Sequence, residues 1–409
     1  MFRSLRSGNL RIWLACMLIS NLGTWMQRTA QDWIVLTELT DYDAFALGVT
    51  TALQFAPQLL LSGPAGLIAD RADRRVYLLY TQSTMALLGI ALAVAALLGA
   101  LTFELMCAFA LALGVVNALD LPARQSFATQ LVQRDDVSNA IALNTAVFNV
   151  ARIGGPALAG VLLTVVGAGW VFALNGATFL AVIVGILFIK PAQIHSVRKA
   201  SGRRQLRAGL AYIGRRADLV FLMTSMFAFG ALGFNFPIFT TTMASIAFGQ
   251  GPAAFGILTS ALGLGSIAGA LIVASRPRAR LRLFIVAAHA FSVASAIAAI
   301  APTLLTFALA LVALGLTAIT LTAASNAYVQ SNTAEDFRGR VISTYFAVFT
   351  GASVLGAPAV GWVANVWGPR WALGVASLTG VIITAIALSC FTNRTGTWTR
   401  RWPGESDPA

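Results

Sequence analysis

The sequence predicts an all-α membrane protein in which twelve transmembrane helices form two pseudo-symmetric six-helix halves. Composition, the spacing of apolar stretches and the placement of positive charge each support this prediction. Of the 409 residues, 58% are hydrophobic and 11% are charged, whereas a soluble globular chain carries about 25% charged residues. Twelve spans of about 20 residues fill roughly 240 residues, which excludes a large soluble catalytic domain.

The apolar stretches are long enough to cross a bilayer as helices. They lie at about 11–37, 44–69, 76–99, 102–121, 139–166, 169–190, 219–246, 251–275, 282–301, 303–328, 339–366 and 370–392. Arg3, Arg6 and Arg11 precede the first stretch in the manner of a signal peptide. However, Arg28 and Asp32 interrupt this stretch and no small-residue cleavage site follows it, so we expect a retained span.

Positive charge predicts the orientation of the chain. If the N-terminus is cytoplasmic, all but three of the 28 lysines and arginines fall on the cytoplasmic side, and the exceptions are Arg28, Arg152 and Arg370. This bias satisfies the positive-inside rule and predicts a multi-pass protein of the cell (plasma or inner) membrane with both termini cytoplasmic. The net charge of +13 then serves orientation and contact with anionic membrane lipid, and no nucleic acid partner is expected.

A basic stretch at 191–218 separates an N-terminal half at 1–190 from a C-terminal half at 219–392, and a cytoplasmic tail follows at 393–409. Three apolar residues of the basic stretch have the spacing of a short amphipathic helix, with a disordered linker as the alternative: Leu206, Leu210 and Ile213.

The two halves repeat each other in sequence. Gln130 recurs as Gln330 and Pro156 recurs as Pro358, at an offset of about 200 residues. Duplicated halves of this kind pack as parallel repeats about an axis normal to the membrane. We therefore expect the substrate site in a central cavity.

The loop between the second and third spans reads Gly66-Leu67-Ile68-Ala69-Asp70-Arg71-Ala72-Asp73-Arg74-Arg75. It resembles the signature loop of the major facilitator superfamily, which has glycine, three residues, aspartate, a basic residue, any residue, glycine and two basic residues. Asp73 stands where this pattern has its second glycine. With Asp73 at this position and with its segments 120–126 and 149–156, the sequence resembles the prokaryotic branch of the superfamily that contains the enterobactin exporter and drug-efflux transporters. The resemblance implies the major facilitator fold and secondary transport.

We interpret this loop as a gate. Acidic residues add nothing to membrane orientation, so Asp70 is expected to accept charge-assisted hydrogen bonds from arginines of neighbouring loops while the cytoplasmic side is closed. The alternative is that the loop only orients the chain and caps helices. The predicted gating residues are Gly66, Asp70, Arg71, Asp73, Arg74 and Arg75.

Charged side chains inside transmembrane spans are rare and usually functional. The first half places Arg28, Asp32 and Arg152 within its spans, whereas the span interiors of the second half carry no charge. Arg28 and Asp32 have the spacing of a local ion pair on one helix, which is the alternative to a proton-responsive site. The residues expected at the coupling site or in the substrate cavity are Arg28, Gln31, Asp32, Asn149, Arg152, Phe234, Asn235 and Phe236.

The seventh span is rich in phenylalanine and is expected to form an apolar wall that selects substrates by area and shape. The alternative is that its phenylalanines face lipid. On the fifth span, small residues that allow close helix approach and a proline that bends the helix resemble the motif of the superfamily's antiporters, with ordinary helix packing as the alternative. These residues are Gly154, Gly155, Pro156 and Gly160.

The expected function is secondary active transport, specifically proton-coupled efflux of small amphipathic or lipophilic organic molecules such as a drug, a siderophore or a metabolite. The expected partners are the small-molecule substrate, protons and membrane lipid, and the chain is expected to act as a monomer. No enzyme activity, cofactor or metal is expected, because the sequence has no phosphate-binding loop and its three cysteines are scattered. The alternatives are an importer or facilitator of a polar metabolite and a non-transporting membrane scaffold.

Overall fold

The computed structural model describes residues 3–189, 206–274 and 281–391. All regular structure in these ranges is helical, so the predicted all-α fold is confirmed. Among the described residues, eleven helical segments are long and apolar enough to cross a membrane, with Ala217–Ala247 counted as one. The helix α1 (Gly8–Ile34) has 27 residues and the length of a span, but its polar residues make it less apolar than the others.

The chain divides into two compact units. The first contains Met1–Ala200 together with Thr240–Ser260, and the second contains Ser201–Phe239 together with Ala261–Ala409. This division departs from the expected halves at Thr240–Ser260, which join the first unit. The reason is a close approach to α5, because a Cβ atom on Gly160 would lie 2.7 Å from the carbonyl oxygen of Pro252.

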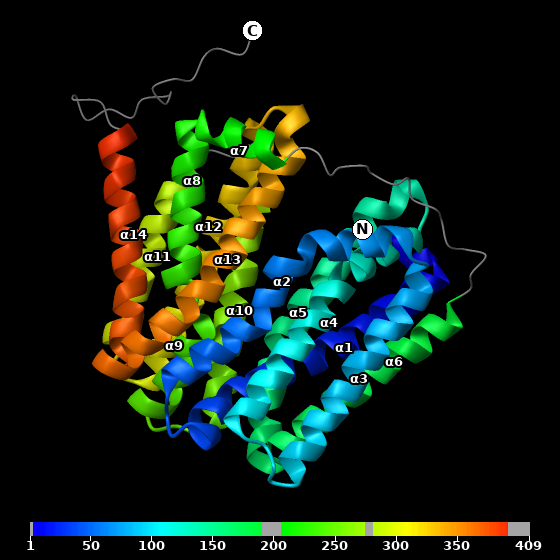
Figure 1. Cartoon of the computed structure of the whole chain (residues 1–409). Helices are drawn as coiled ribbons and strands as arrows, with labels where there is room; N and C mark the ends of the chain where they lie inside the picture. The colour runs from blue at the N-terminus through cyan, green and yellow to red at the C-terminus, as the bar shows by residue number, and fades with distance from the viewer. Residues whose placement is uncertain (1–2, 190–205, 275–280, 392–409) are drawn as a thin grey trace. The chain divides into compact units, whose positions relative to one another are not determined.

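Six long helices build the first unit: α1 (Gly8–Ile34), α2 (Ala44–Arg71), α3 (Arg74–Leu97), α4 (Phe103–Gln130), α5 (Val137–Val165) and α6 (Ala168–Phe188). Within this unit α3 packs along α6, α2 packs along α4, and α1 contacts both α5 and α6 (Figure 1). Glycine permits the contact of α2 with α4, since a Cβ atom on Gly114 would lie 2.5 Å from the carbonyl oxygen of Gln54.

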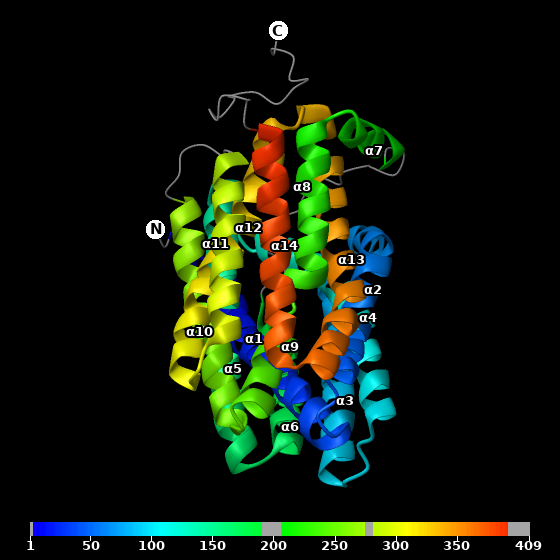
Figure 2. The ribbon, with the colours of Figure 1, turned by 90° about the vertical axis from the view of Figure 1, so that its left-hand side faces the viewer.

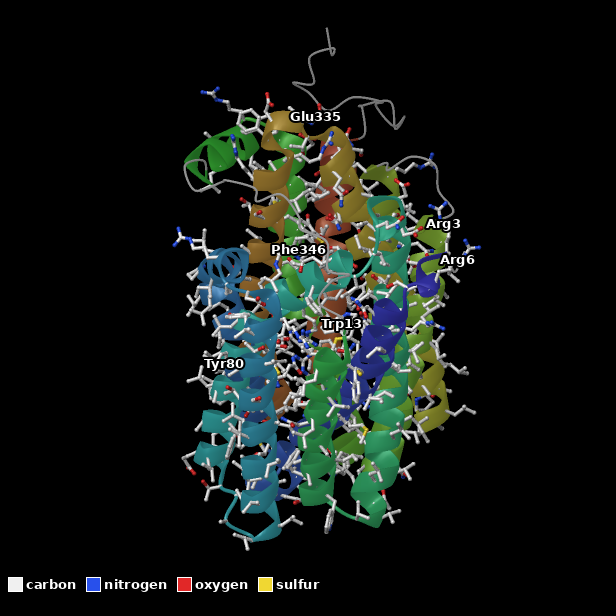
Figure 3. The ribbon with its side chains drawn as sticks, turned by 90° about the vertical axis from the view of Figure 1, so that its right-hand side faces the viewer. Arg3, Arg6, Trp13, Tyr80, Glu335 and Phe346 are labelled. Carbon is white, nitrogen blue, oxygen red and sulfur yellow. The ribbon has the colours of Figure 1, made fainter. Side chains whose placement is uncertain are left out.

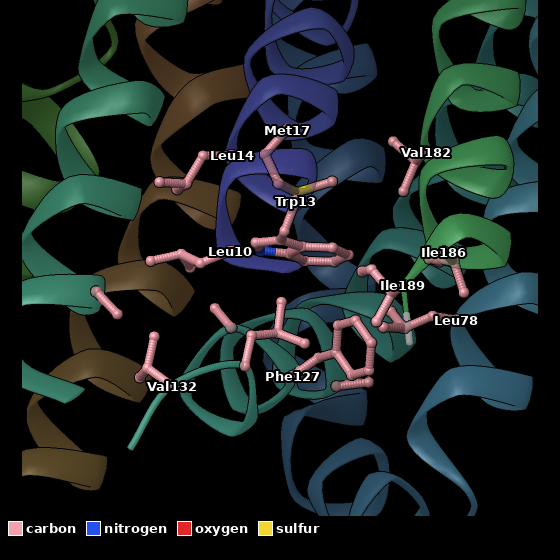
Figure 4. Packing of buried hydrophobic residues seen from close by; sticks show 14 of the residues in the cluster. Leu10, Trp13, Leu14, Met17, Leu78, Phe127, Val132, Val182, Ile186 and Ile189 are labelled. Carbon is pink, nitrogen blue, oxygen red and sulfur yellow. The ribbon is translucent and has the colours of Figure 1, made fainter. Parts of the chain in front are cut away.

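An aromatic pair anchors the core of the first unit near the start of α1. The ring of Trp13 meets the ring of Phe127 edge to face, with 5.0 Å between ring centres, and both side chains are fully buried. Aliphatic side chains from α1, α3 and α6 surround the pair (Figure 4). Trp13 lies among the helices, whereas Tyr80 of α3 points outward and is 72% exposed (Figure 3). The pair therefore joins the ends of α1 and α4.

The second unit is built mainly by α7 (Leu206–Gly214), α8 (Ala217–Ala228), α11 (Leu281–Ile300), α12 (Leu304–Asn332), α13 (Glu335–Trp367) and α14 (Pro369–Phe391). In this unit α11 packs against both α12 and α14 (Figure 2). The short helix expected around 206–213 is present as α7. The helix α10 (Pro252–Ala274) begins in the first unit and ends in the second.

The seventh span is a broken helix. After α8, a π-helical segment at Phe229–Gly233 ends in two residues outside any helix, α9 (Phe236–Thr242) follows, and a second π-helical segment occupies Met243–Ala247. Proline is favoured in the first turn of a helix, where its missing amide hydrogen costs nothing, and Pro237 holds such a place in α9. The Nδ2 atom of Asn235 donates to the carbonyl oxygen of Ala231 at 2.7 Å, which satisfies part of the interrupted backbone.

Candidate functional site

A polar pocket lies inside the first unit, among α1, α2, α3, α4 and α6. It contains two arginines and four amide side chains in an otherwise apolar helix bundle. Polar groups are expensive inside a membrane and mark sites where ions or substrates bind. The lining residues are Thr24, Gln27, Arg28, Gln54, Met85, Leu113, Gly114, Asn117, Arg124, Asn175 and Phe179.

Aromatic rings hold the side chain of Arg28. Its guanidinium carbon lies 5.3 Å from the ring centre of Trp25 and 5.4 Å from that of Phe55, which is the geometry of cation–π contacts. Asp32 and Arg124 both act on its charge through space. Among the residues that the structure describes, no carboxylate lies within ion-pair distance of Arg28. The local ion pair with Asp32, considered above as an alternative, is therefore not formed.

A second arginine reaches the pocket from α4. The Nη2 atom of Arg124 lies 2.7 Å from Oδ2 of Asp120, whose side chain is fully buried. Oδ1 of Asp120 accepts hydrogen bonds from Thr81 at 2.6 Å and from Gln82 at 2.9 Å. This network joins α3 to α4 and fixes Arg124 at the edge of the pocket.

The role of this pair was not predicted, because the fourth span was expected to end at residue 121. The helix α4 instead continues through Pro122 to Gln130, so Arg124 lies inside it and not in a cytoplasmic loop. One signal was available in the sequence: Asp120 and Arg124 have the same four-residue spacing that singled out Arg28 and Asp32.

Two amide carbonyls at the pocket accept hydrogen bonds from neighbouring side chains. Oε1 of Gln27 accepts from Nδ2 of Asn175, and Oδ1 of Asn117 accepts from Arg124 at 3.4 Å. Gln27 and Asn117 therefore have an engaged carbonyl oxygen, whereas their N–H groups make no hydrogen bond among the described residues. Single asparagines and glutamines form no periodic pattern, so the sequence alone did not group them.

Other predicted coupling residues lie outside this pocket. Gln31 is 1% exposed, and neither of its amide atoms has a hydrogen-bond partner among the described residues. Asp32 is half-buried, one turn beyond Arg28 on α1. On α5, Asn149 donates to the carbonyl oxygen of Thr145 at 3.0 Å, and Arg152 is half-buried. The structure thus brings Arg28 into the pocket, and coupling roles for all five of these residues stay a prediction.

The predicted gating loop connects α2 to α3. Asp73 caps α3, because its carboxylate accepts from the backbone amides of Arg75 at 2.9 Å and Val76 at 3.2 Å. The Nη2 atom of Arg75 donates to the carbonyl oxygen of Leu187 at 3.1 Å, at the end of α6. The side chain of Asp70 lies outside the described part of the structure, so its role in a gate stays a prediction. The remaining members of this loop lie on the last turns of α2 or the first residue of α3: Gly66, Arg71 and Arg74.

The glycine motif of α5 faces two other helices. A Cβ atom on Gly155 would lie 2.5 Å from Cβ of Trp25, and one on Gly154 would lie 3.3 Å from Leu22. Gly160, further along α5, approaches the start of α10. Pro156 lies on α5 between Gly155 and Gly160. Gly155 therefore sets the position of Trp25, whose ring holds Arg28, and a conformational role for the motif stays a prediction.

The phenylalanines of the seventh span fall into distinct environments within the second unit. Phe229 and Phe239 are fully buried, whereas Phe227 is 44% exposed, as expected for a lipid-facing residue. Phe234 and Phe236 are partly exposed and lie 5.7 Å apart between ring centres. Phe234 also packs on Phe291 and Phe349 of α11 and α13, at 5.4 Å and 5.6 Å between ring centres. Between the two, Asn235 is buried, and its Oδ1 atom lacks a partner among the described residues.

A polar network that was not predicted closes one end of the second unit. Arg216 pairs with Asp218 at 2.7 Å between Nη2 and Oδ2, and the hydroxyl of Tyr328 donates to the same carboxylate at 3.0 Å. The hydrogen bonds with Asp218 raise the pKa of the Arg216 guanidinium above its ordinary value. Beside it, Tyr212 of α7 stacks on Phe337 of α13 with 4.7 Å between ring centres. The network attaches α7 to α8, α12 and α13.

The fold and the polar intramembrane pocket together define a polytopic membrane transporter of the major facilitator type. A family model described as "transmembrane secretion effector" matches residues 2–400, and the chain belongs to this family of the major facilitator superfamily. It is therefore a transporter and not an enzyme, and the scaffold alternative is not retained.

Curated relatives support the same class. The chain is 27% identical over 255 residues to the Staphyloferrin A transporter of Staphylococcus aureus (strain NCTC 8325 / PS 47), covering 62% of this chain and 63% of the relative. It is 30% identical over 205 residues to the uncharacterized MFS-type transporter YfiS of Bacillus subtilis (strain 168), covering 49% of this chain and 46% of the relative. The matches thus span less than two thirds of each relative.

Solved structures share the fold at low sequence identity. The nucleoside transporter NupG has a TM-score of 0.71 at 11% identity, covering 95% of this chain and 100% of its own. A bacterial homolog of the human lysosomal transporter Spinster, in an inward-facing and occupied conformation, has a TM-score of 0.70 at 15% identity, covering 96% of this chain and 98% of its own. These likenesses show the fold alone.

Proposed function

We propose that the protein is a proton-coupled exporter of small amphipathic or lipophilic organic molecules, such as a drug, a siderophore or a metabolite. One observation carries the proposal: Arg28 lines a polar pocket within the first unit and Asp32 follows one turn later on α1. A carboxylate near an arginine can exchange its electrostatic partner for a proton, and such residues mark proton relays in membrane proteins. Asp32 is the proposed proton acceptor.

The direction and the class of substrate rest on two further features. The family description names secretion, which supports export. Phe234 and Phe236 offer partly exposed aromatic surface, which favours substrates with an apolar body. The donor-rich pocket favours the second candidate, an importer or facilitator of a polar metabolite.

We also infer a location in the cell (plasma or inner) membrane, with both termini cytoplasmic, from the one-sided distribution of lysine and arginine. Membrane lipid contacts the exposed apolar side chains in this proposal, and the monomer is the functional form. The location and the orientation follow from charge and composition and are independent of the substrate.

The test is accumulation of a fluorescent lipophilic dye in cells with and without the protein, each with and without a protonophore. We expect less dye in cells that contain the protein, and loss of this difference when the proton gradient is dissipated. Higher accumulation in cells with the protein would contradict export and favour the importer. An unchanged difference in the presence of the protonophore would contradict proton coupling.

A further inference from the structure

Two arginines line the pocket of the first unit, and only one of them is paired with a carboxylate of the described residues. Arg124 is neutralised by Asp120 at 2.7 Å, and this carboxylate is fully buried behind it. The guanidinium of Arg28 contacts the rings of Trp25 and Phe55, and no carboxylate of the described residues lies within ion-pair distance of it. Asp32 acts on Arg28 through space but does not line the pocket. The pocket therefore presents one guanidinium that is available for a negatively charged ligand.

The uncharged lining has the same preference. The carbonyl oxygens of Gln27 and Asn117 each accept from a neighbouring donor, so these two amide groups offer a ligand mainly their N–H bonds. Nε of Arg124 is buried without a hydrogen-bond partner among the described residues. Groups that only donate are satisfied by a ligand that only accepts.

Apolar side chains complete the lining. Met85, Leu113 and Phe179 belong to it, and Trp25 and Phe55 flank Arg28. A ligand that fits this arrangement has an accepting, negatively charged head and an apolar or aromatic body.

We propose that this pocket binds the carboxylate of an amphipathic organic anion, with Arg28 as its charged partner. A carboxylate accepts two parallel hydrogen bonds from a guanidinium, and its single negative charge matches the one available arginine. A phosphate brings a charge nearer to −2, for which the pocket has no second unpaired cation among the described residues. The inference rests on the proposed transport function and names the substrate class for it.

The test compares probes that share one aromatic body: 2-naphthoate, methyl 2-naphthoate, 2-naphthylmethylamine and 2-naphthyl phosphate. Binding to the purified full chain in detergent is measured as the concentration-dependent rise of the melting temperature. We expect saturable stabilisation by 2-naphthoate and none by the ester or the amine at the same concentrations. This comparison needs no variant. Equal stabilisation by the acid and the ester, or tighter binding of the phosphate, would overturn the proposal.

Variants locate the binding to Arg28. Arg28→Gln is expected to weaken 2-naphthoate binding by about tenfold, the effect of roughly 1.4 kcal/mol, and Arg28→Lys is expected to retain part of it. The matched control is Arg11→Gln, which makes the same change at an exposed position of the same helix and should bind like the unchanged protein. An affinity in Arg28→Gln equal to that of the control would overturn the assignment.

The outcomes also separate this proposal from the proposed function. Binding of 2-naphthoate at Arg28 combined with transport that ignores the proton gradient would contradict proton coupling and leave the carboxylate site intact. Proton-coupled export of the amine without any acid binding would overturn the carboxylate site and leave the proposed function intact.

Discussion

Asp120 and Arg124 are joined by an ion pair of 2.7 Å, one turn apart on α4, in which the carboxylate is fully buried and the arginine reaches the pocket that also contains Arg28. The ion pair holds the guanidinium of Arg124 in the lining of the pocket. Thr81 and Gln82 donate to the other oxygen of the carboxylate, so the position of Arg124 depends on Asp120 and on two uncharged side chains that hold this carboxylate in place.

Removal of this carboxylate should destabilise the protein strongly. Asp120→Ala leaves Arg124, whose side chain is 14% exposed, without its partner. Breaking a buried ion pair typically costs about 3–5 kcal/mol, and the expected result is a clearly lower melting temperature of the purified protein. The double variant Asp120→Asn with Arg124→Gln removes both charges and should be more stable than Asp120→Ala. The single variants Asp120→Asn and Arg124→Gln complete the comparison. If the double variant loses as much stability as these two single variants lose together, the two side chains do not couple in this way.

Asp32→Asn should separate the two transport activities. Without a titratable carboxylate, uphill efflux driven by a proton gradient should be abolished, whereas downhill exchange of substrate across proteoliposomes should persist. The control is Asp41→Asn in the exposed connection before α2, where Asp41 has a φ of 46° that asparagine also tolerates. Loss of both activities in Asp32→Asn would indicate structural damage instead of lost coupling.

Asp70→Asn should lower the transport rate while the protein remains folded and inserted, because a neutral amide accepts weaker hydrogen bonds from arginine than a carboxylate does. We expect a loss of about tenfold or more, consistent with roughly 1.5–3 kcal/mol for a hydrogen bond to a charged group. Asp43→Asn makes the same change at the opposite end of α2, where Asp43 is the N-cap and asparagine caps equally well. The gating role is wrong if Asp70→Asn transports at the rate of this control.

Phe234→Ala and Phe236→Ala should change the range of transported substrates with little effect on proton dependence, since both side chains are partly exposed. Phe229→Ala should instead lower stability by about 3–5 kcal/mol, the usual cost of emptying a fully buried aromatic site. Phe227→Ala, at an exposed side chain, is the neutral comparison. An unchanged substrate profile in all of these variants would contradict the apolar wall.

Gly155→Ala should disturb the contact between α5 and α1. Its Cβ atom would lie 2.5 Å from that of Trp25, and overpacking of this kind costs about 1–3 kcal/mol. At Gly63 of α2 nothing described lies within 4 Å of an added Cβ atom, so Gly63→Ala should be neutral or stabilising by about 0.5–1 kcal/mol. Equal changes in melting temperature for Gly155→Ala and Gly63→Ala, relative to the unchanged protein, would contradict this prediction.

The sequence was sufficient for the fold because long apolar runs and one-sided arginines report the solvent around each segment directly. It was less informative where a polar side chain pairs with another side chain inside the bundle and is not in contact with solvent. Arg124 was assigned to a loop because a charge ordinarily ends a span, whereas in the structure it lies within α4 and pairs with buried Asp120.

Residues that act through contacts between distant segments were also hidden. Asn175 and Gln27 bind each other across α6 and α1, and no spacing within either helix indicates this. The break in the seventh span escaped notice for a different reason, because Phe234, Asn235 and Phe236 continue its apolar composition while Pro237 alone marks the interruption. Arg28 was recognised because charged residues within an apolar span are conspicuous in composition alone.

The two π-helical segments at Phe229–Gly233 and Met243–Ala247 bracket α9, and the boundary between the compact units falls within this short helix. A π turn accommodates one residue more than an α turn, so exchanging one form for the other slips the helical register by a residue. In an α-helix each residue contributes a rotation of about 100° and a rise of about 1.5 Å. A slip in one bracket with the reverse slip in the other would therefore swivel α9 about its axis while the lengths of the flanking segments stay almost constant. Each exchange replaces i→i+5 hydrogen bonds by i→i+4 hydrogen bonds, so a rotation of α9 requires these backbone bonds to break and form again.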